Sequence, residues 1–197
     1  MRVLSPASLE YDGPGERTHE DRAAVFVELY RTQFEYVWQS AHRLGVRAEE
    51  VDDGVQETFL TVHRLMNEYE HRGSIRGWLF SILYRVTQRH KRSSRRWTSG
   101  WDSEASFETV PESSAHGPDR IAEAEQDARR LEAILDKLNP EQRAVLVLTE
   151  IEERPVTEVA EILGINIYTA RSRLRLAREH VATSLERQTA RDRWRLK

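Results

Sequence analysis

Hydrophobic residues recur at helical spacing in three stretches of the first half of the chain. The stretches run from Thr18 to Gly45, from Glu49 to Tyr69, and onward from Ser74. Thr18 and Ser74 are side chains that can cap the start of a helix. The pattern predicts a three-helix domain over residues 18–97, preceded by a flexible arm at 1–17. The predicted core residues are Phe26, Tyr30, Phe34, Val37, Trp38, Ala41, Leu44, Val51, Val55, Phe59, Val62, Leu65, Met66, Ile75, Trp78, Leu79, Ile82, Leu83 and Val86.

Four further helices are predicted over residues 119–187. Asn139 followed by Pro140 opens the second of them, because asparagine caps a helix and proline is favoured at its first position. Pro155 then separates this helix from the last two. The first two helices are lined by Ile121, Ala124, Ala128, Leu131, Ile134, Leu135 and Leu138, then by Ala144, Val147, Leu148 and Ile151.

The last two predicted helices are separated by a tight turn. A short helix from Val156 to Leu163 ends at Gly164, which can adopt a left-handed conformation without steric cost. Asn166 can cap the next helix. That helix directs Ala170, Leu174, Ala177, Val181 and Leu185 toward a core. A short helix, a glycine turn and a longer helix are typical of a helix-turn-helix.

The longer helix carries polar and basic residues around its apolar stripe: Thr169, Arg171, Ser172, Arg173, Arg175 and Arg178. Arginine can pair bidentately with guanine or with phosphates, and hydroxyl groups can reach bases or backbone oxygens. The pattern predicts duplex DNA binding. An ordinary amphipathic helix with a solvated basic face remains the alternative.

The first domain carries two contrasting charged surfaces. The middle helix has an acidic outer face that includes Asp53, Gln56 and Glu57. The third helix ends in a basic run without acidic residues, made of Arg85, Arg89, His90, Lys91, Arg92, Arg95 and Arg96. Interleaved aromatics (Trp78, Phe80, Tyr84 and Trp97) indicate a single-stranded DNA surface, since bases stack on aromatics while cations follow phosphates. The alternatives are a Trp78 packed in the core and a solvated basic helix end.

Between the two domains, residues 98–118 lose hydrophobic periodicity and predict a disordered linker. Its acidic residues, Asp102, Glu104, Glu108 and Glu112, could cover the basic surfaces and lower the DNA affinity of the free protein. Residues 188–197 form a short basic tail.

Composition limits the remaining functions. The 197 residues carry a net charge of −3. They include no cysteine, so disulfides and thiolate metal sites are excluded. We expect no cofactor and no enzymatic activity, because no metal-ligand spacing, phosphate loop or nucleophile motif occurs. The N-terminus lacks a signal-peptide core and no run spans a bilayer, which predicts a cytoplasmic protein without membrane insertion.

Several short motifs on both sides of the linker resemble those of bacterial extracytoplasmic-function (ECF) sigma factors. In the first domain they are Asp53-Gly54-Val55-Gln56-Glu57-Thr58-Phe59 and Gly73-Ser74-Ile75-Arg76-Gly77-Trp78-Leu79-Phe80-Ser81-Ile82. In the second they are Leu138-Asn139-Pro140-Glu141-Gln142-Arg143, Val159-Ala160-Glu161-Ile162-Leu163-Gly164 and Thr169-Ala170-Arg171-Ser172-Arg173-Leu174. The resemblance covers family region 2 in the first domain and region 4 in the second, and implies an all-α protein of two small domains.

The resemblance also implies a role for each surface. Asp53, Gln56 and Glu57 would bind the clamp helices of the RNA polymerase β′ subunit, and region 4 would dock on the β flap. Promoter −10 DNA, opened to single strands, would be bound by His71, Arg72, Gly73, Ser74, Arg76, Trp78, Arg85 and Arg89. The −35 duplex would be read by Thr169, Arg171, Ser172, Arg173, Arg175 and Arg178. The linker would thread the RNA-exit path, and an anti-sigma factor holds many members inactive.

The chain departs from the family pattern at three positions. Val86 stands where asparagine is usual, Tyr168 replaces a common glycine and Leu176 a common arginine. These departures bear on the promoter sequence more than on the role. A stand-alone helix-turn-helix regulator and a sigma-like module that binds a partner without starting transcription are the competing predictions. An enzyme using Asp52, Asp53 and Glu57 to hold a cation is a weaker one.

Overall fold

The described part of the chain is built from helices. The computed structural model describes residues 19–66, 69, 74–94, 130–131 and 133–195. Its elements are α1 (His19–Arg43), α2 (Ala48–Leu65), α3 (Ile75–Ser94), α5 (Pro140–Leu146), the π-helical turn η3 (Val147–Ile151), α6 (Val156–Leu163) and α7 (Ile167–Arg195). This confirms the all-α prediction, while the predicted arm (1–17) and linker (98–118) lie outside the described residues. None of the described helices is long and apolar enough to cross a membrane.

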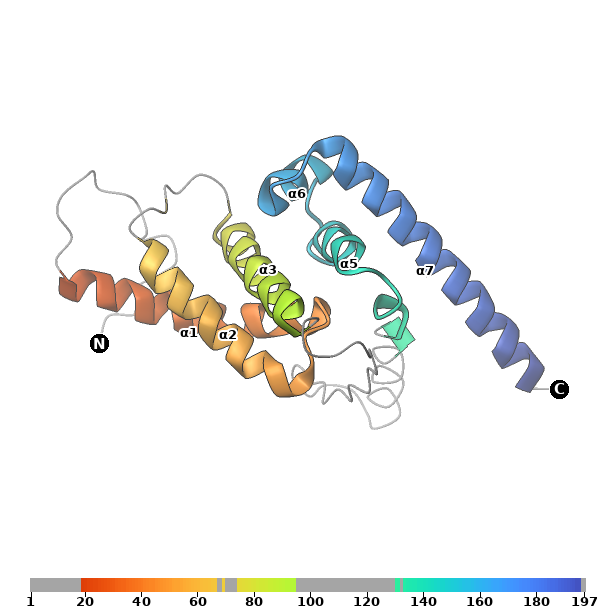
Figure 1. Ribbon diagram of the computed structural model, residues 1–197, viewed down its shortest axis with the longest axis horizontal. Coiled ribbons are helices and arrows are strands. Elements are labelled where there is room, and N and C mark those ends of the chain that lie inside the picture. The colour runs from red at the N-terminus through yellow and green to blue at the C-terminus, as the bar shows by residue number, and fades with distance from the viewer. Residues whose placement is uncertain (1–18, 67–68, 70–73, 95–129, 132, 196–197) are drawn as a thin grey trace, which may run out of the picture.

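Helices α1, α2 and α3 pack against one another as a first helical unit (Figure 1). Val37, Val62, Leu79 and Leu83 are fully buried between them. Gly45 has a φ of 74°, so it supplies the left-handed turn between α1 and α2. The predicted extension of the second helix to Tyr69 is wrong. The helix ends at Leu65, and the Tyr69 ring instead lies 4.5 Å from that of Trp78 on α3.

Local sequence signals define the second helical unit, which consists of residues 133–138 followed by α5, η3, α6 and α7. Asn139 caps α5 by accepting a hydrogen bond from the Gln142 amide at 2.8 Å, as predicted, and Pro140 follows it. Gly164 ends α6 with a φ of 64°, which confirms the predicted left-handed turn. Ala170, Leu174 and Ala177 on α7 are buried.

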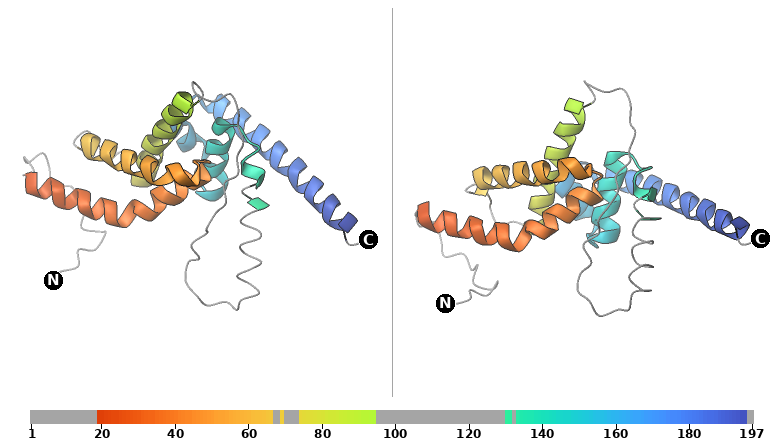
Figure 2. Two further views of the ribbon diagram at one scale, coloured as in Figure 1. Left: turned by 60° about the horizontal axis from the view of Figure 1, so that its bottom comes forward. Right: turned by 90° about the horizontal axis from the view of Figure 1, so that it is seen from below.

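The second half of α7 differs from the sequence prediction. Leu185, expected in the core, is 49% exposed, and Ser184 beside it is buried instead. The helix continues to Arg195 and projects away from the rest of the molecule (Figures 1 and 2). No helix of the described residues covers the end of this projection, where Trp194 is 84% exposed. Ser184 continues the buried stripe of Ala170 and Ala177 at seven-residue spacing, which leaves Leu185 to the side of that stripe.

The two units are packed together, with α6 against α3 (Figure 1). One contiguous cluster of buried side chains extends through both. On α3, Gly77 makes this approach possible, because a Cβ there would lie 3.0 Å from Cδ1 of Ile162 on α6.

A buried arginine joins the units at a second point. The Arg143 side chain is 5% exposed and pairs with Asp136 at 2.5 Å. Its guanidinium also donates to the backbone carbonyls of Arg43 at 2.5 Å and His42 at 3.2 Å. These carbonyls end α1, where a cation is favoured by the helix dipole. Arg143 thus acts as a cap that the second unit provides to the first.

Candidate nucleic-acid interface

The first turns of α7 form an exposed polar face. The Asn166 side chain accepts a hydrogen bond from the Tyr168 amide at 2.8 Å, which confirms the predicted cap. Since Ala170, Leu174 and Ala177 face the core, the opposite side of the helix is left to solvent. The predicted duplex-binding residues on it are exposed, apart from the half-buried Arg173: Thr169, Arg171, Ser172, Arg175 and Arg178.

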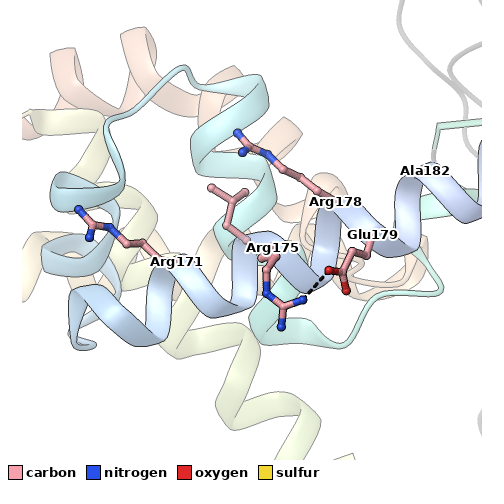
Figure 3. Close-up of a pocket in the computed structure, with 6 residues that line it drawn as sticks. Arg171, Arg175, Arg178, Glu179 and Ala182 are labelled. Atoms are coloured by element: carbon pink, nitrogen blue, oxygen red, sulfur yellow. Dashed lines mark hydrogen bonds and ion pairs between the residues drawn. The ribbon is translucent and has the colours of Figure 1, made fainter.

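Ion pairs hold two of these arginines in place. Arg175 pairs with Glu179 one turn along α7, and Arg178 pairs with Glu150 of η3 at 2.7 Å. Arg171, Arg175, Arg178 and Glu179 line an open hollow along the helix (Figure 3). Exposed pairs contribute at most about 1 kcal/mol, so phosphates can compete for these guanidinium groups. The face is therefore suited to a polyanion.

The predicted single-strand surface is only partly described. His71, Arg72 and Gly73 lie outside the described residues, as does Trp97. Arg76, Arg85 and Arg89 are exposed on α3. Trp78 is partly buried and packs on Tyr69, so the alternative of a fully buried core residue is wrong, while its contact with DNA stays a prediction.

The prediction is wrong for one aromatic residue of this surface. Phe80 is fully buried in the core of the first helical unit, so it cannot meet a nucleic-acid base. The physical reason is that α3 packs against α1, α2 and α6, so its buried face is wide enough to include Phe80 beside Leu79 and Leu83. The aromatic part of the surface is thus reduced, among the described residues, to the half-buried Trp78 and Tyr84.

The acidic face of α2 is exposed, although one of its residues has a partner. Asp53 and Gln56 are open to solvent. Glu57 is half-buried, and its two carboxylate oxygens contact Arg89 and His90 of α3. The structure therefore brings together Glu57 and Arg89, which the sequence assigned to separate surfaces. On the same face, Leu60 is 56% exposed.

Sequence reasoning missed the polar contacts at the start of α3. Arg154, which precedes α6, donates a hydrogen bond to the Ser74 hydroxyl at 2.8 Å and pairs with Glu158 at 3.0 Å. The Ser74 hydroxyl is thus hydrogen-bonded to a residue of the second helical unit. Because Arg154 and Ser74 are 80 positions apart, no local pattern marks them as partners.

Buried polar groups lie close to this contact. The Tyr36 hydroxyl donates to the Arg76 carbonyl at 3.3 Å, and the Arg76 guanidinium lies 5.0 Å from the centre of the Tyr36 ring. Burial raises the pKa of Tyr36, and the Glu152 carboxylate adds to the effect. Glu152 itself pairs with Arg43 at 3.2 Å across the two units. This side of the predicted single-strand surface is therefore covered by intramolecular contacts.

Comparison with known proteins identifies both units. Residues 29–97 match the family described as Sigma-70 region 2, and residues 128–181 match Sigma-70, region 4. These matches and the helix-turn-helix define a sigma-70-type transcription initiation factor. ECF RNA polymerase sigma factor SigC from Mycobacterium tuberculosis is 31% identical over 138 residues, which cover 68% of this chain and 70% of that protein. The chain belongs to the ECF RNA polymerase sigma factors, which direct polymerase to specific promoters.

A second relative supports this assignment, and a solved structure supports the fold. ECF RNA polymerase sigma factor SigE from Mycolicibacterium smegmatis is 30% identical over 175 residues, which cover 86% of this chain and 66% of SigE. The fold matches that of the sigma factor RpoE from Bartonella quintana, solved in complex with the anti-sigma factor NepR. That match has a TM-score of 0.65 and 19% identity, and it covers 82% of this chain and 97% of RpoE.

Proposed function

We propose that three surfaces of this sigma factor divide the work of promoter recognition. The α2 face of Asp53, Gln56 and Glu57 binds the clamp helices of the β′ subunit, and the second unit docks on the β flap. The residues before α3, together with residues of α3 itself, bind the opened −10 element: His71, Arg72, Gly73, Ser74, Arg76, Trp78, Arg85 and Arg89. The exposed face of α7 reads the −35 duplex, through Thr169, Arg171, Ser172, Arg173, Arg175 and Arg178.

The observation that carries this proposal is the exposed face of α7. It follows a left-handed glycine turn, and its first turns carry hydroxyl and guanidinium groups opposite a buried apolar stripe. In a helix-turn-helix, these positions of the second helix contact base edges in the major groove. The basic α3 supports the −10 assignment, since exposed arginines can follow the phosphates of an opened strand.

The proposal extends to partners and location. Polymerase and promoter DNA are the partners, and the protein acts in the cytoplasm without a cofactor and without catalysis of its own. An anti-sigma factor is a further proposed partner, supported by the complex in which the similar fold of RpoE was solved.

The packed arrangement of the two units constrains how this function can operate. Arg154 holds Ser74, and Ile162 lies against Gly77, so the second unit covers the start of α3. On DNA, the −10 and −35 elements lie about 25 base pairs apart, which is about 85 Å along the helix axis. Helix α6 packs directly on α3 here. The two units must therefore separate before both elements can be bound.

Run-off transcription with purified core polymerase on a library of upstream fragments tests the proposal. We expect position-specific transcripts from the wild-type protein. Asp53→Lys should abolish them by preventing polymerase binding. It is a cleaner variant than a change at Glu57, whose carboxylate also holds Arg89 and His90.

The double variant Arg171→Ala, Arg173→Ala should retain polymerase binding and lose upstream recognition. Polymerase binding without any transcript would instead indicate a partner-binding module. Duplex binding without polymerase binding would indicate a stand-alone helix-turn-helix regulator.

A further inference from the structure

Tyr168 is the exposed aromatic residue at the start of the proposed −35-reading helix. It is the second residue of α7, and its side chain is 74% exposed. Its backbone amide is fixed by the Asn166 side chain at 2.8 Å, so the position of the residue on the helix is well defined. Glycine is common at this position in the family pattern that the chain resembles, whereas this chain carries an aromatic ring.

The register of α7 determines where this ring points. Residues three, four and seven positions apart share one helix face, which places Tyr168 in line with Arg171, Ser172 and Arg175. This stripe is opposite the buried Ala170. When a helix lies in the major groove, its outermost stripe meets the base edges, while its flanks meet the two phosphate backbones. The N-terminal residues come closest to the bases.

We propose that Tyr168 reads a thymine in the −35 element by packing its ring against the C5-methyl group. This inference rests on the proposed function of α7. The thymine methyl is the apolar group that base pairs display in the major groove, and aromatic side chains contact it there. The flanking arginine and serine supply hydrogen bonds but no large apolar surface. The ring therefore adds a contact that a glycine at this position could not make.

The test uses holoenzyme, reconstituted from core polymerase and the full chain, on promoters found by the transcription assay. Each −35 thymine is replaced in turn by deoxyuridine, which lacks only the C5-methyl group. For the wild-type protein, one replacement should weaken promoter binding about three- to fivefold, the factor expected for one buried methyl group. The Tyr168→Ala protein should bind the unmodified promoter about as weakly as the wild-type protein binds the deoxyuridine promoter. The same replacement should then not weaken its binding further.

Two variants separate the alternatives. Tyr168→Phe keeps the ring and should retain the methyl discrimination, whereas a phosphate contact through the hydroxyl would make it behave like Tyr168→Ala. Trp194→Ala removes an exposed aromatic from the far end of the same helix and should change nothing.

The inference is overturned if Tyr168→Ala keeps the wild-type response, if Tyr168→Phe loses it, or if no −35 thymine is sensitive. Each of these results leaves promoter-specific initiation intact. A chain that forms no holoenzyme, or a holoenzyme that starts no specific transcript, contradicts the proposed function itself and this inference with it.

Discussion

Arg143 shows how one residue can determine the relative position of two helical units. Its guanidinium joins Asp136 of the second unit to the last carbonyls of α1 in the first. Gly45 leaves the room for it, because a Cβ there would lie 2.7 Å from Nη1 of Arg143. A buried guanidinium is tolerated here because its hydrogen bonds to a carboxylate and two carbonyls offset the loss of hydration.

Replacing Arg143 should therefore destabilise the protein. Arg143→Met keeps most of the apolar stem but leaves the carbonyls of His42 and Arg43 without this donor. We expect the free energy of unfolding in urea to fall by about 2–3 kcal/mol, as for other buried hydrogen bonds to charged groups. Arg175→Met, which breaks the exposed pair with Glu179, is the control and should cost under about 1 kcal/mol. Equal losses would contradict this role.

The stability should also depend on the protonation of His42. Burial lowers the pKa of its imidazole, and the Asp52 carboxylate offsets part of this effect. The unfolded chain therefore binds the proton more readily than the folded one, so this contribution to stability is present above about pH 6.5 and is lost as the pH falls. His42→Phe, which keeps a ring beside Trp38, should make the free energy of unfolding less dependent on pH between 7 and 5. An unchanged pH dependence would contradict the assignment.

Residues of the candidate site differ in how far sequence alone predicts them. The arginines of α7 could be predicted, because their exposure follows from the spacing of Ala170, Leu174 and Ala177. The burial of Phe80 and the pairing of Glu57 with Arg89 could not, since each depends on how α3 packs in three dimensions.

At the scale of elements, helix ends with a local signal were predictable. Asn139 with Pro140, Gly164 and Asn166 act through the hydrogen bonds and backbone angles of their immediate neighbours. The early end of α2 and the π-helical turn η3 have no such signal. The extent of α7 to Arg195 was also missed, because its last turns carry no regular apolar stripe for periodicity to detect.

Gly77 provides a test of the packing between α3 and α6. Gly77→Ala places a methyl group 3.0 Å from Ile162, closer than side chains normally approach. Alanine also favours the helix itself by up to about 1 kcal/mol. The Ile162 side chain must then give by a few tenths of an ångström. We therefore expect α3 to stay folded while its contact with α6 weakens, so that the two units separate in a larger fraction of the molecules. Fluorescence energy transfer between dyes on Thr32→Cys in α1 and Thr183→Cys in α7 should decrease, and the absence of native cysteine makes this labelling specific.

Gly54→Ala is the matched control for this measurement. Gly54 is also buried within a helix, but a Cβ there would meet no other atom within 4 Å. The substitution should leave the energy transfer unchanged. A decrease of the same size in both variants, or in neither, would show that contact between Gly77 and Ile162 does not hold the units together.

At the scale of the whole molecule, the two helical units of the free chain pack against each other in a closed arrangement. Three contacts that join the units involve Arg143, Arg43 with Glu152, and Arg154 with Ser74. The last of these engages a residue that we assign to −10 binding. Core polymerase would hold each unit beside its own promoter element. The free energy that separates the two units would therefore have to come from their binding to polymerase. Tethering then raises the effective concentration of each weak DNA contact.

Binding of promoter duplex with and without core polymerase tests this account most directly. The free protein should bind promoter DNA weakly, because its units are closed on each other. The holoenzyme should bind tightly, with an affinity that falls steeply as salt rises, because arginines displace counterions from phosphates. The central claim is that the two units bind separate promoter elements only when the protein is bound to core polymerase. Equal affinity with and without core polymerase would contradict it.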